Sequence, residues 1–265
     1  MRGLAALVVV AGMTAGAAQA QEATAVYAAG SLREALTEVA GLWQAQSGHR
    51  AVLTFGASGL LRQRIEQGET AQVFASADTE HPQRLAAGGQ WEAPAVFTRN
   101  ALCALTSAQV DTTPQGLLDV LLRPGIRLGT STPGADPSGD YAWALFRRAE
   151  ALRPGALAAL EAKALTLTGG PDSPQAPPGR GTYAWIMDSG QADVFLTYCT
   201  NAVASQREVP RLKVVALPAD LQVGAAYGLT VRKGAPEAAR DFAAFVLSPA
   251  AQAVFTRLGF LENRP

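Results

Sequence analysis

Residues 25–38, AVYAAGSLREALTE, predict the strand, turn and helix around which the rest of the chain is organised. The apolar run before Gly30 is typical of a strand, and beyond it apolar residues recur at helical spacing. Ser31 is the expected N-cap of the helix, and Glu34 completes the capping-box pattern S-x-x-E. The first N–H groups of such a helix lack intrahelical partners and carry the positive end of its dipole, so this junction is a candidate anion site. A serine that only caps its own helix would explain the same pattern.

Similar strand-to-helix junctions follow along the chain. Ser58 comes after a predicted strand at 51–55, Ser138 lies in a turn-rich loop after a strand at 126–129, and Tyr198 ends the run DVFLTY. Strands that alternate with helices through short loops predict an α/β fold with a parallel sheet covered on both faces. Ligands of such sheets bind beyond the carboxyl ends of the strands. The side chains expected at that edge are those of Ser31, Ser58, Ser138 and either Tyr198 or Thr200.

The composition is that of a globular protein without a strongly charged partner. The chain has 265 residues, of which 48% are hydrophobic and 17% charged, and its formal net charge is zero. This length can form one large or two modest cores. A neutral chain without a basic run lacks the Lys/Arg-rich face that nucleic acids require, so we expect no nucleic-acid partner.

Residues 1–20 have the pattern of a cleavable signal peptide. Arg2 provides the positive charge, residues 4–10 the apolar segment, and Ala18-Gln19-Ala20 the cleavage site. The mature chain is expected to begin at Gln21, where no cysteine stands to carry a lipid anchor. No later apolar run is long enough to cross a bilayer. We therefore expect a periplasmic protein.

Two further features leave alternatives open. The loop at 169–181, GGPDSPQAPPGRG, contains too many prolines and glycines for a helix or sheet interior. Such a long loop is either a surface insertion or the rim of a functional site. Cys103 and Cys199 are the only cysteines and either form a disulfide or remain two buried thiols. A Cα separation above about 7 Å would exclude the bond.

The sequence argues against an enzyme or a metalloprotein. A serine hydrolase of the α/β type needs G-x-S-x-G, whereas Leu60 stands where the last glycine should be. The two histidines, His49 and His81, both lie in the first third of the chain, so no histidine follows in the serine, acid, histidine order of that fold. Two histidines and two cysteines this widely separated do not form a metal-ligand cluster either. No phosphate-binding G-x-x-x-x-G-K motif occurs. We expect neither catalysis nor a cofactor.

The chain resembles the periplasmic molybdate-binding proteins of bacterial molybdate ABC importers. The resemblance is carried by VYAAGSLREAL at 26–36, FGASGLLRQRIEQG at 55–68, VFASAD at 73–78 and the segment AYGLTVRKGAPEAARDFAAFVLSPAAQAVFTRLGF at 226–260. It implies a two-lobed binding-protein fold of type II, in which each lobe is a mainly parallel sheet flanked by helices and the ligand lies in the cleft. Lobe 1 would comprise residues 22–100 plus 222–265, and lobe 2 residues 101–221.

The resemblance also implies a ligand site. Ser31 and Ser58 match the family's two serine positions, Tyr198 its tyrosine, and Ser138 a position that contributes a backbone N–H. Arg180 falls at or near a further position that is normally apolar, and it either enters the cleft or is a solvated arginine of the proline-rich loop. If it enters, Arg180→Ala is expected to weaken anion binding at least about tenfold.

The resemblance implies a monomer that closes around molybdate or tungstate and delivers it to the membrane permease of an ABC importer. The segments DPSGDYAW at 136–143 and YCTNA at 198–202 differ from better-known members of the family. The alternative ligands are therefore sulfate, phosphate or a small organic acid.

Overall fold

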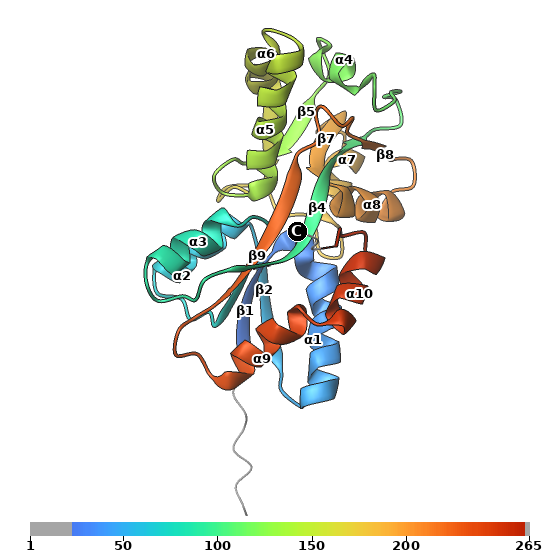
Figure 1. Cartoon of the computed structure of the whole chain (residues 1–265). Coiled ribbons are helices and arrows are strands. Elements are labelled where there is room, and N and C mark those ends of the chain that lie inside the picture. The colour runs from blue at the N-terminus through green and yellow to red at the C-terminus, as the bar shows by residue number, and fades with distance from the viewer. Residues whose placement is uncertain (1–22, 263–265) are drawn as a thin grey trace, which may run out of the picture.

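The structure is a computed structural model that describes residues 23–262, so the expected signal peptide lies outside the described residues. Two lobes are stacked and joined by the long strands β4 and β9 (Figure 1). The elements of the lower lobe in Figure 1, called lobe 1, are β1 Thr24–Ala29, η1 Gly30–Leu32, α1 Arg33–Ser47, β2 Ala51–Gly56, α2 Ser58–Glu66, β3 Val73–Ser76, α3 Glu80–Ala87, α9 Glu237–Val246 and α10 Pro249–Arg257, with parts of β4 Ala95–Thr106 and β9 Gly224–Val231.

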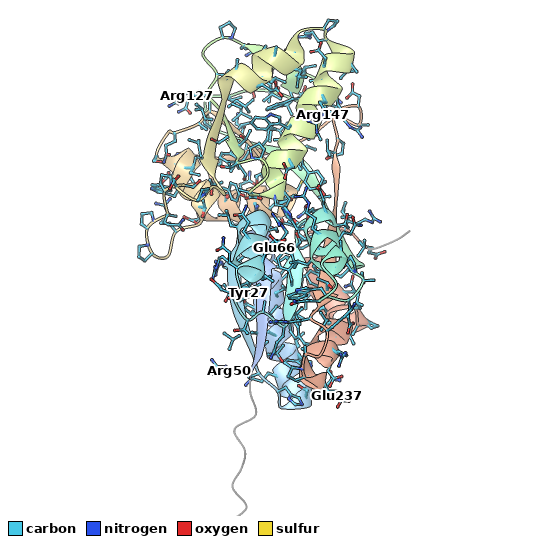
Figure 2. All side chains as sticks on the ribbon, turned by 90° about the vertical axis from the view of Figure 1, so that its left-hand side faces the viewer. Tyr27, Arg50, Glu66, Arg127, Arg147 and Glu237 are labelled. Carbon is cyan, nitrogen blue, oxygen red and sulfur yellow. A yellow bond between two sulfur atoms is a disulfide. The ribbon has the colours of Figure 1, made fainter. Side chains whose placement is uncertain are left out.

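The upper lobe, called lobe 2, contains the remaining elements. These are α4 Leu117–Leu122, β5 Leu128–Ser131, α5 Pro137–Leu152, α6 Ala156–Lys163, β6 Ala164–Thr168, α7 Thr182–Asp188, β7 Val194–Tyr198, α8 Cys199–Glu208 and β8 Lys213–Ala216. Figure 2 shows Arg127 and Arg147 on this half of the molecule, and Tyr27, Arg50 and Glu237 on the other.

The α/β fold predicted from the alternating strands and helices is confirmed, but the sheets are mixed rather than mainly parallel. In lobe 1, β1 pairs in parallel with β2 and β3, and in lobe 2, β5 pairs in parallel with β6 and β7. The antiparallel pairs all involve β4 or β9. Alternation of strands and helices cannot reveal the antiparallel direction of β4 and β9, because these two strands carry the chain from one lobe to the other.

Strand β4 belongs to both lobes. Its first half, up to Ala101, pairs with β9, and its second half, from Leu102, pairs with β7 and β8. The change of partner therefore falls between Ala101 and Leu102, and Gly224 opposite Ala101 marks the return of the chain. We use this change of pairing to describe the two lobes.

A disulfide joins Cys103 in β4 to Cys199 at the start of α8, with the two Cα atoms 4.8 Å apart. Of the two alternatives left by the sequence, the structure selects the bond. Because Cys199 directly follows Tyr198, the disulfide ties the end of β7 to the neighbouring strand. The same strand end therefore carries both the crosslink and a predicted ligand residue.

The largest apolar cluster includes residues from both lobes. The rings of Tyr198 from lobe 2 and Tyr227 from β9 lie 5.5 Å apart, and Tyr227 also packs edge-on against Phe97 and Phe260. Aromatic contacts of this kind add to the stabilisation that burial itself provides. Within residues 23–262, the helices are too short or too polar to span a membrane.

Candidate functional site

A cavity of about 1120 Å³ lies between the two lobes. Lobe 1 lines it with the ends of β1 and β2 and the starts of the helices that follow, and lobe 2 lines it with the starts of α7 and α8. The proline-rich loop at 169–181 contributes Gly169, Gly170, Ser173, Gln175 and residues 176–181 to the wall. The loop is therefore the rim of a candidate site and not only a surface insertion.

Ser31 lies at the cleft, but it does not cap its helix as the sequence predicts. The chain leaves β1 through the short 3-10 turn η1, which starts at Gly30 and has no side-chain cap. The Ser31 hydroxyl instead lies 3.0 Å from the Tyr227 hydroxyl, and Glu34 pairs with Arg207 of lobe 2 at 3.5 Å. The tight turn moves the serine away from its own amides, so its hydroxyl faces the lobe boundary.

Ser58 and Tyr198 are joined through the backbone of one residue, Ala77. The Ser58 hydroxyl accepts the N–H of Ala77 at 3.1 Å, and the Tyr198 hydroxyl donates to the Ala77 carbonyl at 3.3 Å. Both side chains line the cavity although each is about 1% exposed. Since Ala77 and Ser58 belong to lobe 1 and Tyr198 to lobe 2, the Tyr198 bond bridges the lobes at the floor of the cleft.

Ser31 is also connected to the crossing point of the chain. Asn100 in β4 donates to the Thr200 hydroxyl at 2.9 Å and to the Tyr227 hydroxyl at 3.3 Å. The polar chain Ser31–Tyr227–Asn100–Thr200 therefore runs from lobe 1 to the start of α8 in lobe 2. Burial raises the pKa of both Tyr198 and Tyr227 well above the usual tyrosine value, so these phenols remain neutral hydrogen-bond donors.

Ser138 is not arranged as the resemblance implies. Its side chain is fully buried, and its N–H donates to Asp136 Oδ1 at 3.0 Å, because Asp136 is the N-cap of α5. The residue that lines the cavity here is Asp136. The backbone donor expected from Ser138 is therefore already engaged by a carboxylate of its own loop.

Arg180 lines the cavity, but its guanidinium is held by two acids of lobe 2. Its Nε lies 2.5 Å from Glu208 Oε1, and a terminal nitrogen lies 2.9 Å from Asp188 Oδ2. These two neighbours raise the pKa of Arg180, so the charge is permanent but balanced. Glu208 also accepts the N–H of Gly181 at 2.9 Å, which fastens the end of the proline-rich loop to α8. In this arrangement Arg180 anchors the rim.

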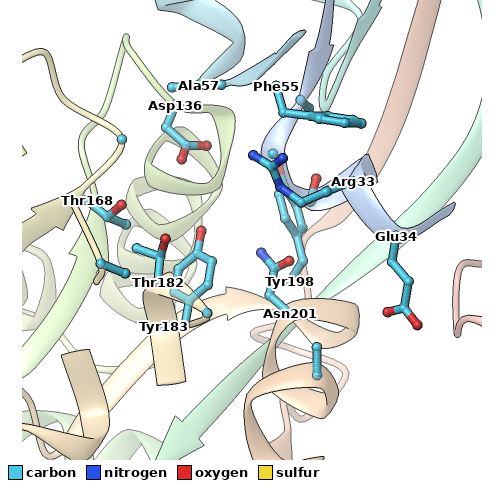
Figure 3. A pocket seen from close by; sticks show the side chains of 18 of the residues that line it. Arg33, Glu34, Phe55, Ala57, Asp136, Thr168, Thr182, Tyr183, Tyr198 and Asn201 are labelled. Atoms are coloured by element: carbon cyan, nitrogen blue, oxygen red, sulfur yellow. The ribbon is translucent and has the colours of Figure 1, made fainter. Parts of the chain in front are cut away.

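Arg33 and Asp136 are cleft residues that the sequence did not single out. The Arg33 guanidinium lies over the Phe55 ring, 4.6 Å from its centroid, and points into the cavity from lobe 1 (Figure 3). Asp136 points into the same space from the lobe 2 side, above Thr168, Thr182 and Tyr183 (Figure 3). Two features of the sequence could have indicated these residues. Arg33 stands two residues after Ser31, and Asp136 begins the pattern D-P-S-G, which is typical of a helix N-cap.

The lobes touch directly beside the cavity. The N–H of Gly59, in the first turn of α2, donates to the Ala135 carbonyl of lobe 2 at 2.8 Å. A Cβ atom on Gly59 would lie 2.5 Å from the Gly134 carbonyl oxygen and 2.7 Å from that of Ala135. Only glycine allows this approach, so the contact depends on the missing side chain.

Residues 23–262 contain no cluster of three or more His, Cys, Asp or Glu side chains suited to a metal ion. The groups that converge on the cavity are hydroxyls together with charged side chains, among them the guanidinium of Arg33 and the carboxylate of Asp136, which face each other across the space. Such a set can bind a small polar ligand.

Comparisons with known proteins agree with a binding site. Residues 24–261 match the model of the family described as bacterial extracellular solute-binding protein. The chain is 40% identical over 209 residues to the uncharacterized protein PM1146 of Pasteurella multocida, covering 77% of this chain and 85% of that protein. It is 28% identical over 255 residues to the molybdate-binding protein ModA of Mycobacterium bovis, covering 94% and 88% of the two chains.

Among solved structures, L-phospholactate-bound PEB3, from Campylobacter jejuni, has the same fold. The TM-score is 0.71 at 17% identity, and the alignment covers 91% of this chain and 100% of the other. The matched family consists of solute-binding proteins and not enzymes, which confirms the prediction that the chain is not an enzyme. The chain belongs to the bacterial extracellular solute-binding protein family.

Proposed function

We propose that this protein captures a small oxyanion in the cleft between its lobes and delivers it to the membrane permease of an ABC importer. The observation that carries the proposal is the convergence of the hydroxyl groups of Ser31, Ser58 and Tyr198 on one cavity. Molybdate and tungstate are the first candidates, because the motifs around the two serines resemble those of molybdate-binding proteins. The similarity to ModA of Mycobacterium bovis supports the same candidates.

The site suits an anion because its donors do not depend on a full counter-charge. An ion that leaves water loses several kcal/mol or more unless new hydrogen bonds replace its hydration shell. Here hydroxyls stand at or beside the starts of α1, α2 and α8, where unpaired backbone N–H groups carry a partial positive charge. The ion would exchange water for fixed dipoles and could still be released.

Capture would use closure of the lobes. Ser31 and Ser58 belong to lobe 1 and Tyr198 to lobe 2, so only the closed form offers the ligand all three groups. A ligand that binds this form better shifts the population toward it. The Gly59–Ala135 hydrogen bond joins the lobes beside the cavity and would be one of the contacts of the closed form.

Competition calorimetry tests the proposal. Molybdate, tungstate, sulfate and phosphate are titrated into the protein, and then into Ser58→Ala and the control Ser47→Ala. Ser47 is an exposed serine at the far end of α1. The Ser58→Ala variant, in contrast, loses both the hydrogen bond to Ala77 and the hydroxyl that would donate to the anion. We expect Ser58→Ala to weaken binding by about 1–3 kcal/mol and the control to have no effect. Absence of binding by all four ions, or equal affinity in Ser58→Ala, would contradict the proposal.

A second candidate is a different anion, such as sulfate, phosphate or a small organic acid. Two observations favour it, namely the carboxylate of Asp136 at the cavity wall and a cavity volume of about 1120 Å³. Organic ligands of drug size occupy pockets of about 300–1,000 Å³. PEB3, which shares the fold, was solved with L-phospholactate, an organic phosphate.

A further inference from the structure

Two opposite charges face the cavity from the two lobes. Arg33 stands in the first turn of α1 in lobe 1, and Asp136 is the N-cap of α5 in lobe 2. In Figure 3 the guanidinium and the carboxylate point toward one another across the open space. Among the described residues, neither Arg33 nor Asp136 forms a salt bridge, taken as an oppositely charged N and O atom within 4.0 Å. Both charges are therefore available to a ligand that fills the space between them.

The carboxylate of Asp136 has no cation beside it. Its Oδ1 accepts the Ser138 N–H, the acids Asp140 and Asp78 lie near enough to repel its charge, and Arg33 faces it only across the cavity. Burial, together with these two acids, raises the pKa of Asp136 to about 6, and the Ser138 N–H and the Ser131 hydroxyl only partly oppose this rise. The nearby phenol of Tyr183 is neutral, since burial raises its pKa to about 12. At neutral pH the lobe 2 wall therefore carries an ionised carboxylate.

An ionised carboxylate can only accept hydrogen bonds. An oxyanion without a hydrogen atom, such as molybdate or sulfate, would place its own negative oxygens against that acceptor. Like charges at close range in a water-poor site repel, and the repulsion is lost only when one of the two is protonated. A ligand with a hydroxyl group can instead donate to Asp136.

We propose, on the basis of the proposed anion-binding function, that Asp136 is a specificity-determining residue that selects anions carrying their own hydrogen-bond donor, and so favours the second candidate class over molybdate and tungstate. The acid group of the ligand faces Arg33 and the hydroxyls of lobe 1, and its hydroxyl group faces Asp136. The chemical class is a hydroxyl-bearing anion, either a protonated inorganic oxyanion or a small organic phosphate with a free hydroxyl. The cavity volume accommodates both.

The test compares ligands that differ mainly in a donor. Inorganic phosphate is compared with sulfate, and glycerol 3-phosphate with n-propyl phosphate, by calorimetry near pH 7.5. In the wild-type protein the donor-bearing member of at least one pair should bind at least about tenfold more tightly. Asp136→Asn should reduce that preference to less than about threefold, because an amide can donate as well as accept. Asparagine is also a good N-cap, so α5 should keep its start.

Asp119→Asn is the matched control, because Asp119 is an exposed acid of α4 whose partner is Arg153. It should leave both preferences unchanged. A second readout uses sulfate, which stays fully ionised: its affinity for the wild type should rise as the pH is lowered from about 7.5 to about 5.5, and should stay flat in Asp136→Asn.

Equal affinity for both members of both pairs, or an unchanged preference in Asp136→Asn, would overturn the inference while leaving anion capture intact. Failure of all these anions, and of molybdate and tungstate, to bind would instead contradict the proposed function and the inference with it. The two failures are therefore distinguishable in one series of titrations.

Discussion

The lobe 1 edge of the cleft presents hydroxyl groups and an arginine without an acidic partner, whereas the lobe 2 edge presents a carboxylate and an arginine bound to two acids. Ser31, Ser58 and Arg33 form the first edge, and Asp136 and Arg180 the second. The motifs that resemble molybdate-binding proteins cluster on lobe 1, and the segments that depart from them lie on lobe 2. Under the proposed function, lobe 1 recognises an acid group and lobe 2 decides which acid binds.

The largest effect should come from the disulfide, which is a feature of lobe 2 alone. Cys103 and Cys199 are 96 residues apart, and closing a loop of about 100 residues stabilises by about 4.7 kcal/mol in the chain-entropy model. Replacing both cysteines by serine should lower the free energy of unfolding by several kcal/mol, measured by denaturant titration. The wild type with added reductant should behave like the double variant, and equal stability in all three samples would contradict this role.

The next effect concerns the contact between the edges. Gly59→Ala places a Cβ against the carbonyl oxygens of Gly134 and Ala135, which are backbone atoms that cannot move aside cheaply. The closed form should lose population, and anion affinity should fall at least about tenfold, or about 1.4 kcal/mol. Gly41→Ala in the middle of α1 is the matched control, because a Cβ there meets nothing within 4 Å. If both variants bind the anion as the wild type does, the closed contact is not part of binding.

The charge of the lobe 2 edge should appear in the pH dependence of stability. The pKa of Asp136 is raised in the folded protein, so its contribution to stability is full at low pH and is lost as the pH rises through about 6. Asp136→Asn should remove this contribution and give a flatter stability curve between about pH 4 and pH 6. Parallel curves for the two proteins, measured by thermal or denaturant unfolding, would show that Asp136 does not titrate in this range.

The smallest effect should come from Arg180. If the Arg180 side chain enters the cleft and contacts the anion, Arg180→Ala should weaken binding at least about tenfold, which is the expectation stated from the sequence. Its pairing with Glu208 and Asp188 predicts a change below about threefold instead, since partly exposed ion pairs contribute about 0–1 kcal/mol. Calorimetry separates the two expectations, and a tenfold loss would mean that Arg180 leaves its acids to meet the ligand.

The sequence could place Ser31 and Ser58 at the lobe 1 wall of the cavity, because they lie on local strand-to-helix junctions whose turns fix their positions. Tyr198 could be placed for the same reason. The actual partners of these residues, Tyr227 and Ala77, are distant in sequence and appear only in the fold. Local patterns therefore identified the junctions but not the network that joins them.

The lobe 2 half was predicted less well, because its chemistry depends on side chains brought together by the fold. The capping of α5 by Asp136 takes the N–H of Ser138, and Glu208 holds Arg180 from 28 residues away. Nor could the pattern of strands show that β4 changes partner between Ala101 and Leu102, since no glycine or proline interrupts the strand there. Only the three-dimensional arrangement distinguishes a strand of one sheet from a strand shared by two.

The most direct test of the central claim is a crystal structure of the protein with the anion that binds most tightly in the competition series. The account predicts density for the ion between the lobes, in contact with the Ser31 and Ser58 hydroxyls on one side and with lobe 2 on the other. An ion bound outside the cleft, or held by residues of a single lobe with the other turned away, would contradict it.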